Sequence, residues 1–228
     1  MCKLNVIAIL ILLFTSCKPK KVIAQMQVDT LKIITEVAIV PEKVLVHDST
    51  FVSIKEYSSD FIFDMKYATT DNFLKQQVYD CAECFLRYGT VKKLINANNE
   101  FISLGYRIKV YDCYRPLDIQ KKMWKIVSNP IYVADPKKGS IHNRGGAVDI
   151  TLVNSLGREL EMGTPFDHFG PEASHQYKQF TNEVIENRKL LKEIMLNNGF
   201  TAFESEWWHY NSSNSSQFPL ANFKWTCY

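Results

Sequence analysis

The sequence of 228 residues lacks a membrane-length apolar run, a marked excess of charge, and any internal repeat or low-complexity segment. Its main apolar run, from Val6 to Phe14, is far shorter than the roughly 20 residues that a membrane-spanning helix needs. Lysine and arginine total 27 against 24 aspartates and glutamates, so the net charge is only +3. These absences argue against a membrane-spanning helix, a repeat array and the concentrated basic face of a nucleic-acid-binding protein.

The N-terminal end has the pattern of a secretory signal. Lys3 precedes the apolar run, and the small residues Thr15 and Ser16 come before a break at Cys17. A basic start, a short apolar core and small residues before a break are typical of a signal peptide. The break at Cys17 resembles the bacterial lipoprotein signal, in which the cysteine becomes the acylated first residue of the mature chain.

We therefore expect a lipoprotein signal peptide over residues 1–16. A lipid-anchored tether would follow over residues 17–48, with a short strand near residues 44–46. The protein would be exported to the bacterial periplasm or cell surface and held at a membrane by the lipid on Cys17. A plain signal peptide that is cut nearby is the alternative.

Cysteine is scarce in the rest of the chain, where only Cys81, Cys84, Cys113 and Cys227 occur. Four cysteines in an exported chain favour disulfides, in any of three connectivities. A Cys-x-x-Cys pair could instead be a redox pair or half of a structural zinc site, but no second close pair of cysteine or histidine completes such a site. We expect Cys81 and Cys84 each to pair with Cys113 or Cys227. A disulfide at Cys113 would brace the chain around Arg115.

Hydrophobic periodicity predicts both helices and strands. Apolar residues at helical spacing indicate helices over residues 87–104 and 182–197, and Pro116 suits the first turn of another. Alternating or short apolar runs indicate strands at residues 51–54, 61–63, 108–110, 147–153 and 207–210. No strand–helix–strand rhythm repeats along the chain. The sequence therefore predicts one α+β domain over residues 49–228, with a central, mainly antiparallel sheet flanked by helices.

Two segments that lie far apart in the sequence carry metal-ligand chemistry. His142 and Asp149 flank Gly145-Gly146, where the chain can turn and bring both side chains to one point. His209 follows Glu206 by three residues in a second, aromatic segment. Two imidazoles and a carboxylate leave zinc an open fourth position for water, as catalytic sites do. The pattern predicts one zinc ion held by His142, Asp149 and His209, with Glu206 as the base for the attacking water.

This prediction carries a geometric condition and has a rival. Residues 206 and 209 would face opposite sides of an ideal strand, so a bend or bulge must turn Glu206 and His209 toward the same metal. Fe(II) bound by two histidines and one carboxylate is the rival. Oxygenase chemistry fits an exported, lipid-anchored chain poorly, and zinc is therefore favoured.

Several further motifs occur together with the metal pattern. The full set is Lys66-Tyr67-Ala68-Thr69 with Asp71-Asn72-Phe73, Asp112-x-Tyr114-Arg115-Pro116, Ser140-x-His142-x-x-Gly145-x-Ala147-x-Asp149, Met162-Gly163 with Phe166-Asp167, and Glu206-Trp207-Trp208-His209. This set resembles the D-alanyl-D-alanine dipeptidase family, which includes the dipeptidase of vancomycin resistance. The family is related to zinc D-Ala-D-Ala carboxypeptidases and hedgehog-like domains. The resemblance covers approximately residues 50–211 and implies a hedgehog/D-Ala-D-Ala peptidase-like fold.

The resemblance implies a role for each matched position. The zinc ion would be held by His142, Asp149 and His209. Glu206 would take a proton from the attacking water and later hand it to the leaving amine. Arg115 would stabilise the oxyanion that forms at the peptide carbonyl, an effect worth about 3–4 kcal/mol of barrier for a fixed donor. The implied reaction is hydrolysis of D-Ala-D-Ala or a related D,D-dipeptide.

A free dipeptide has an ammonium and a carboxylate, and the resemblance implies a partner for each. Asp167 matches the position that receives the amine, with Tyr67 nearby. Ser140 matches the residue that hydrogen-bonds the carboxylate, and Asp112 would orient its neighbours. Because burying either charge without a partner is prohibitive, these residues would also exclude longer peptides.

Two other functions remain open. A peptidoglycan D,D-carboxypeptidase or endopeptidase would have an open cleft and would cleave N-acylated substrates, which an amine pocket at Asp167 disfavours. A non-catalytic, zinc-containing cell-wall binding module would show no chelator-sensitive hydrolysis, and the presence of Glu206 and Arg115 disfavours it.

Overall fold

The computed structural model describes residues 45–227. The predicted signal peptide and nearly all of the predicted tether therefore lie outside the described residues. Leu45 and Val46, at the start of the described part, are not in a strand, so the strand predicted near residues 44–46 is not found at these two positions. None of the helices in residues 45–227 is long and apolar enough to cross a membrane.

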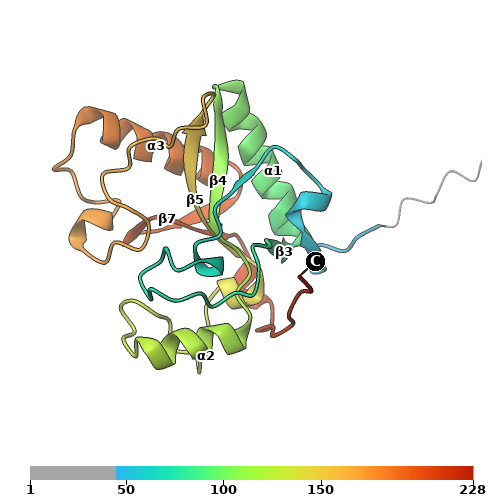
Figure 1. The fold of residues 1–228 in the computed structure, drawn as a ribbon. Coiled ribbons are helices and arrows are strands. Elements are labelled where there is room, and N and C mark those ends of the chain that lie inside the picture. Colours follow the sequence, from blue (N-terminus) through green and yellow to red (C-terminus); the bar gives the residue numbers. More distant parts are fainter. Residues whose placement is uncertain (1–44, 228) are drawn as a thin grey trace, which may run out of the picture. The chain divides into compact units, whose positions relative to one another are not determined.

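A five-stranded sheet forms the centre of the fold (Figure 1). Its strands lie in the order β2-β4-β5-β7-β6. Neighbouring strands are antiparallel except for β2 and β4, which are parallel. The mainly antiparallel sheet predicted from the sequence is thus confirmed. The bounds are Ile62–Phe63 for β2, Tyr106–Asp112 for β4, Ala147–Asn154 for β5, Phe200–Phe203 for β6 and Glu206–Ser212 for β7.

Two long helices pack against this sheet. α1 (Tyr88–Ser103) contacts β4, α3 (Asn182–Asn197) contacts β6, and the two helices contact each other. Each is followed by a glycine with positive φ, Gly105 and Gly199, a common way for a helix to end. The helix predicted over residues 182–197 has the predicted bounds. Four apolar side chains at helical spacing on α1 are fully buried: Val91, Leu94, Ala97 and Phe101.

Shorter elements complete the domain. α2 (Leu117–Ile126) follows Pro116 directly and lies apart from α1 and α3 (Figure 1). β1 (Phe51–Ser53) and β3 (Phe85–Arg87) pair antiparallel as a separate two-stranded sheet. Five short 3-10 helices lie between these elements: η1 (Ile54–Glu56), η2 (Lys66–Ala68), η3 (His142–Arg144), η4 (Pro171–Ala173) and η5 (Ser215–Gln217).

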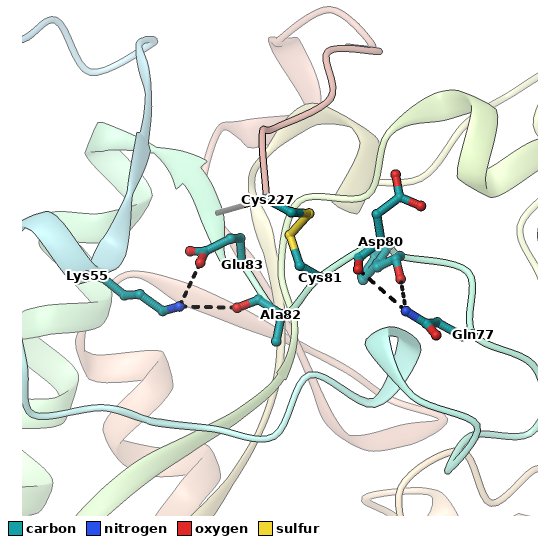
Figure 2. Close-up of a disulfide and its surroundings, with 8 residues drawn as sticks. Lys55, Gln77, Asp80, Cys81, Ala82, Glu83 and Cys227 are labelled. Carbon is teal, nitrogen blue, oxygen red and sulfur yellow. Dashed lines mark hydrogen bonds and ion pairs between the residues drawn. A yellow bond between two sulfur atoms is a disulfide. The ribbon is translucent and has the colours of Figure 1, made fainter.

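Two disulfides join distant parts of the chain. Cys84 bonds to Cys113, and Cys81 bonds to Cys227, as Figure 2 shows for the second pair. The expectation that Cys81 and Cys84 each pair with Cys113 or Cys227 is confirmed. The Cys84–Cys113 bond is fully buried, whereas Cys227 is exposed. One bridge therefore lies inside the core, and the other fastens the C-terminal end to the loop before β3.

Candidate metal centre and catalytic cleft

A closely packed turn brings the first two predicted ligands together. His142 begins η3, and Gly145 ends it at φ 73°, a conformation that glycine adopts without steric cost. A side chain at Gly145 would also collide with Phe51. Beyond the turn the chain enters β5, which carries Asp149. His142 Nε2 then lies 3.3 Å from Asp149 Oδ2, so the glycine turn acts as the sequence predicts.

β7 supplies the third ligand. Asp149 and His209 are paired across the β5–β7 ladder. Directly opposed residues on antiparallel strands have side chains on the same face. His209 Nδ1 accordingly lies 2.9 Å from Asp149 Oδ1. The sheet itself therefore fixes this half of the cluster.

A bulge in β7 meets the geometric condition on Glu206 and His209. Ala202 of β6 pairs with Tyr210, and a regular ladder would pair the next residue, Phe203, with His209. Phe203 instead pairs with Glu206, so extra residues of β7 bulge out of the ladder. Glu206 and His209 then line the same cavity. The broken alternation is also visible in two adjacent residues that are both buried, Trp207 and Trp208.

The three predicted ligands converge with distances that suit zinc. His142 Nε2 lies 3.1 Å from His209 Nδ1, and both nitrogens are near Asp149 as given above. One ligand atom from each residue lies within 4.8 Å of the other two. Two atoms that each bind a tetrahedral zinc ion at about 2.1 Å are about 3.4 Å apart. The observed separations of 2.9 to 3.3 Å are close to that value.

Neighbouring acceptors fix which ring nitrogen of each histidine faces the cluster. His142 Nδ1 donates to the Cys113 carbonyl at 2.6 Å, and His209 Nε2 donates to Asn211 Oδ1 at 2.9 Å. In the neutral rings, the lone pairs are therefore on His142 Nε2 and His209 Nδ1. Two lone pairs and a carboxylate that face one another repel unless a cation lies between them. The donor set thus fits a divalent metal, and bonds of this kind orient metal-binding histidines.

The charges in the metal-free cluster support the same conclusion. Burial alone would raise the pKa of Asp149, but His142 and His209 hold that pKa well below its usual range. The pKa of His209 is raised, because its hydrogen bond and charge pairing with Asp149 outweigh the effect of burial. Without metal, the Asp149 carboxylate therefore favours protonation of His209.

Metal binding should therefore release protons and strengthen with rising pH. A metal must displace the proton whose affinity for His209 is raised, so lowering the pH favours the metal-free protein. Calorimetric titration with zinc in buffers of different ionisation enthalpy measures the number of protons released. Repeating the titration at two pH values near neutrality measures how zinc affinity depends on pH. Zinc affinity that stays constant or increases as the pH falls would contradict this ligand assignment.

Glu206 lies beside the cluster without belonging to it. Its carboxyl is half-buried and lines the cavity that the metal ligands face. Burial raises the pKa of Glu206 above its usual value, although the imidazole of His209 opposes the shift. A carboxyl with a raised pKa is better suited to take a proton at neutral pH and return it.

Arg115 is held rigidly in the wall of the cavity. Its Nε and Nη2 donate to Asp112 Oδ2 at 3.2 and 2.6 Å, and its Nη1 donates to Gln120 Oε1 at 3.0 Å. Tyr79 holds the other oxygen of Asp112 through its hydroxyl at 2.7 Å. Burial opposes the charge, but Asp112 raises the pKa of Arg115 further above its usual value. Arg115 is therefore a fixed cation, and the fully buried Asp112 orients it.

Tyr67 and Asp167 form a second polar pair in the cavity. The Tyr67 hydroxyl lies 3.1 and 3.2 Å from the two carboxylate oxygens of Asp167. Burial, together with the nearby Asp149 carboxylate, raises the pKa of Asp167 well above its usual value. Among residues 45–227 no cation forms an ion pair with this carboxylate, and a bound ammonium would supply one. Asp167 also has a positive φ of 60°, which aspartate tolerates better than most residues.

Ser140 lies at the start of the metal-binding turn. Its hydroxyl oxygen accepts a hydrogen bond from the His142 amide at 3.2 Å. The Ser140 amide donates to Asn143 Oδ1 at 2.7 Å. These bonds fix Ser140 against η3, where its half-buried side chain lines the cavity.

One cavity of about 390 Å³ collects nearly all of the predicted site residues. Asp112 does not line it, consistent with an orienting role. A larger hollow of about 520 Å³ lies against Phe166 and Asp167, but it contains none of the metal ligands. Chemistry therefore identifies the smaller cavity as the catalytic cleft. The predicted residues that line it are Tyr67, Arg115, Ser140, His142, Asp149, Asp167, Glu206 and His209.

Three groups that support the site are not predicted from the sequence. Asn211 lies two residues after His209 on β7, a spacing that could have indicated a shared strand face. Gln120 lies on α2, five residues after Arg115, and nothing in the pattern marks it. The third group is the Cys113 carbonyl, and a backbone acceptor leaves no sequence signal.

The fold and the cleft together define a class of protein. A buried cluster of two imidazoles and a carboxylate lies beside a free glutamate and a fixed arginine in one cavity. A metal ion polarises a carbonyl and lowers the pKa of water, the glutamate moves protons, and the cation stabilises an oxyanion. This is the site of a metallopeptidase.

Comparison with known proteins gives the family. The model of the peptidase M15 family, described as D-ala-D-ala dipeptidase, matches residues 47–225, and the chain belongs to this family. The D-alanyl-D-alanine dipeptidase of Escherichia coli is 34% identical over 74% of this chain and 88% of its own length. That of Enterococcus faecium is 29% identical over 70% of this chain and 90% of its own.

A solved structure shows a more distant likeness. VanYB in complex with D-alanine-D-alanine is 16% identical over 58% of this chain and 74% of that chain, with a TM-score of 0.40.

Proposed function

We propose that the protein hydrolyses D-Ala-D-Ala, or a closely related D,D-dipeptide, in a reaction that depends on one zinc ion per chain. One observation carries the proposal: a single cavity contains the His142, Asp149 and His209 cluster together with the carboxylate of Asp167. A hydrolytic centre and a receptor for an ammonium within one small cleft suit a substrate that is short and has a free amine. The names of the relatives support the same substrate.

In the proposed reaction, His142, Asp149 and His209 hold the zinc ion. When bound, the ion supplies Lewis acidity for the peptide carbonyl and for water. Glu206 accepts a proton from the attacking water and transfers it to the leaving amine. Its raised pKa suits both steps, because the carboxyl must hold the proton in between.

Arg115 acts on the charge that develops at the carbonyl oxygen. Its Nε–H and one N–H of each terminal nitrogen already donate to Asp112 or Gln120. The remaining N–H groups can donate to the oxyanion without first leaving water, because Arg115 is already buried. Preorganised donors of this kind need no rearrangement during the reaction.

The two ends of the dipeptide are recognised by different groups. Asp167, oriented by the Tyr67 hydroxyl, receives the ammonium. Ser140 hydrogen-bonds the carboxylate. A peptide whose amine is acylated would leave Asp167 buried without a cation, and this penalty disfavours longer chains.

A panel of three substrates tests the proposal. Purified, zinc-loaded protein is incubated with D-Ala-D-Ala, N-acetyl-D-Ala-D-Ala or L-Ala-L-Ala, with and without chelator, and the release of free alanine is measured. We expect chelator-sensitive hydrolysis that is fast for D-Ala-D-Ala, slow for the N-acetyl form and absent for L-Ala-L-Ala. Preferential cleavage of the N-acetyl substrate would instead indicate a carboxypeptidase, and no hydrolysis of any substrate would indicate a binding module.

Asp167→Asn should separate binding of the amine from chemistry. Because a hydrogen bond to a charged group contributes about 1.5–3 kcal/mol, we expect a roughly 10- to 100-fold loss of kcat/KM on D-Ala-D-Ala, mainly through KM. Slow cleavage of N-acetyl-D-Ala-D-Ala should not decrease. The control is Asp71→Asn, which removes a largely exposed carboxylate. Equal losses on both substrates would contradict the proposed role.

We further propose that the protein is exported and held at a membrane by a lipid on Cys17. The two disulfides support this, because such bonds persist mainly in oxidising compartments. In the producing bacterium, Cys17→Ala should move the protein from the membrane fraction to the soluble fraction with its specific activity unchanged. A variant that stays in the membrane fraction would contradict lipid attachment at Cys17.

A further inference from the structure

The last residues of the described chain run beside the catalytic loops without forming a helix or strand. Residues 218–227, here called the C-terminal strap, appear as the dark red segment near β3 in Figure 1. The Cys81–Cys227 disulfide closes the strap at its end, and Figure 2 shows this bond next to the Lys55–Glu83 ion pair. The strap lines none of the catalytic cleft. Any effect on the reaction must therefore pass through other residues.

One route from the strap to the cleft runs through Asn143. The Ala221 amide donates to the Asn143 carbonyl at 2.8 Å, and the Ala221 carbonyl accepts from the Leu117 amide at 3.1 Å. The fully buried Asn143 side chain donates to the Arg115 carbonyl at 2.7 Å and accepts from the Ser140 amide at 2.7 Å. Asn143 therefore joins the strap to the residues proposed for the oxyanion and for the substrate carboxylate.

A second route reaches the side chain of Arg115. The Trp225 ring packs edge-on against Tyr79, with 5.4 Å between ring centres. The Tyr79 hydroxyl holds one oxygen of Asp112, and the other oxygen holds the guanidinium of Arg115. Cys81 lies two residues beyond Tyr79. The disulfide thus fastens the strap close to the point where this route begins.

Further contacts hold the strap against the chain near Arg115 and Ser140. Phe223 stacks on Tyr114 with ring centres 4.5 Å apart, and the Tyr114 hydroxyl donates to the Phe223 carbonyl at 3.2 Å. Leu220 lies so close to Gly139 that a side chain at Gly139 would collide with it. Tyr114 and Gly139 precede Arg115 and Ser140 directly. The strap therefore contacts the chain next to both residues.

We propose that the C-terminal strap, closed by the Cys81–Cys227 disulfide, positions Arg115 and Ser140 for the proposed dipeptidase reaction, and that Asn143 is a positioning residue through which part of its effect passes. The inference rests on the proposed function for its kinetic consequences. Arg115 would act mainly in the transition state and Ser140 mainly on the bound substrate. Loss of positioning should therefore lower kcat and, to a smaller extent, raise KM.

The test compares two variants with the wild-type protein, all loaded with zinc and normalised to bound metal. Asn143→Ala removes both side-chain bonds, and a double variant, Cys81→Ser with Cys227→Ser, opens the strap. Because small misplacements of catalytic groups can cost up to about 100-fold, we expect kcat to fall roughly 10- to 100-fold for Asn143→Ala and about tenfold for the double variant. Assays are run well below each melting temperature. A merely stabilising strap would lower the melting temperature and leave kcat and KM per metal-loaded chain unchanged, and that result would overturn the proposal.

Combining the changes tests whether they act along one route. If Asn143 transmits the effect of the strap, the combined loss should be smaller than the product of the separate losses. Fully multiplicative losses would overturn the proposal. Glu83→Gln is the matched control, because it breaks the adjacent ion pair with Lys55 while keeping the disulfide. It should leave kcat and KM unchanged, and a loss equal to that of the double variant would also overturn the proposal.

Amide hydrogen exchange separates failure of this inference from failure of the proposed function. Opening the strap should speed exchange at the amides of Leu117 and Ala221, which form the hydrogen bonds between the strap and the rest of the domain. Exchange should also be faster at the amide of Ser140, which donates to the Asn143 side chain. This measurement needs no turnover. Wild-type protein that does not hydrolyse D-Ala-D-Ala would refute the proposed function alone, whereas unchanged exchange at these amides would refute the strap.

Discussion

Replacing Glu206 with alanine is expected to lower kcat on D-Ala-D-Ala by roughly 100- to 10,000-fold, the range for loss of a positioned general base. Zinc content should not change, because the three groups that converge on the metal position are His142, Asp149 and His209. The half-buried Glu206 carboxyl only lines the cavity beside them. Steady-state kinetics and metal analysis of the same preparation measure both quantities.

Two controls accompany this variant: one keeps the shape of the Glu206 side chain, and the other changes a glutamate nearby in the sequence. Glu206→Gln keeps the size of the side chain but cannot accept the proton, so it should be as inactive as the alanine variant. Glu204→Ala removes an exposed carboxylate two residues away, which pairs with Lys192, and it should retain near-normal turnover. If Glu206→Ala kept near-normal activity, Glu206 would not be the base. If it lost its zinc, Glu206 would be a ligand instead.

Replacing Arg115 with lysine is expected to lower kcat about 100-fold, as loss of an oxyanion donor does. Lysine keeps a positive charge next to the fully buried Asp112, which avoids the cost of roughly 3–5 kcal/mol for breaking a buried ion pair. However, its ammonium cannot reproduce the fork that contacts Asp112 and Gln120 at once. The fold should therefore persist while alignment with the carbonyl is lost.

Kinetics and thermal unfolding check this prediction together. KM should change little, since the oxyanion exists only in the transition state. Arg158→Lys alters an exposed arginine and serves as the control with no expected effect. A variant in which KM rises tenfold while kcat is retained would show that Arg115 binds the substrate in its ground state, contrary to the proposed role.

The elements with strong local periodicity are predicted well from the sequence. α3 has the predicted bounds, and α1 differs by one residue at each end, because their apolar faces and following glycines are local signals. β3 and β6 are not predicted. These strands have three and four residues, too few to show a clear pattern of their own, and pairing with β1 and β7 defines them.

The metal cluster is predicted because a few residue types must converge for the chemistry. The bulge in β7 is predicted as a requirement, since strand parity would otherwise separate Glu206 from His209. The β6 residue that pairs across the bulge could not be predicted, because the shifted pairing of Phe203 with Glu206 is a property of the folded β6–β7 ladder. Backbone acceptors such as the Cys113 carbonyl are likewise invisible in a sequence.

The disulfides show that the number of cysteines does not predict their connectivity. Four cysteines in a chain with a predicted export signal indicate two bridges, but the choice between the remaining partners of Cys81 and Cys84 depends on the folded backbone. The C-terminal strap is missed for a related reason. Its contacts with Asn143 and Tyr79 are backbone bonds and ring packing between segments far apart in the chain, and no periodic pattern encodes them.

The central claim is that zinc held by His142, Asp149 and His209 is required to hydrolyse D-Ala-D-Ala. Its most direct test is to titrate metal-free protein with zinc while following the release of D-alanine and the amount of bound metal. We predict that activity rises in proportion to bound zinc, reaches a plateau at one ion per chain, and is absent before the first addition. Turnover by rigorously metal-free protein, or zinc bound at one ion per chain with no hydrolysis, would contradict the account.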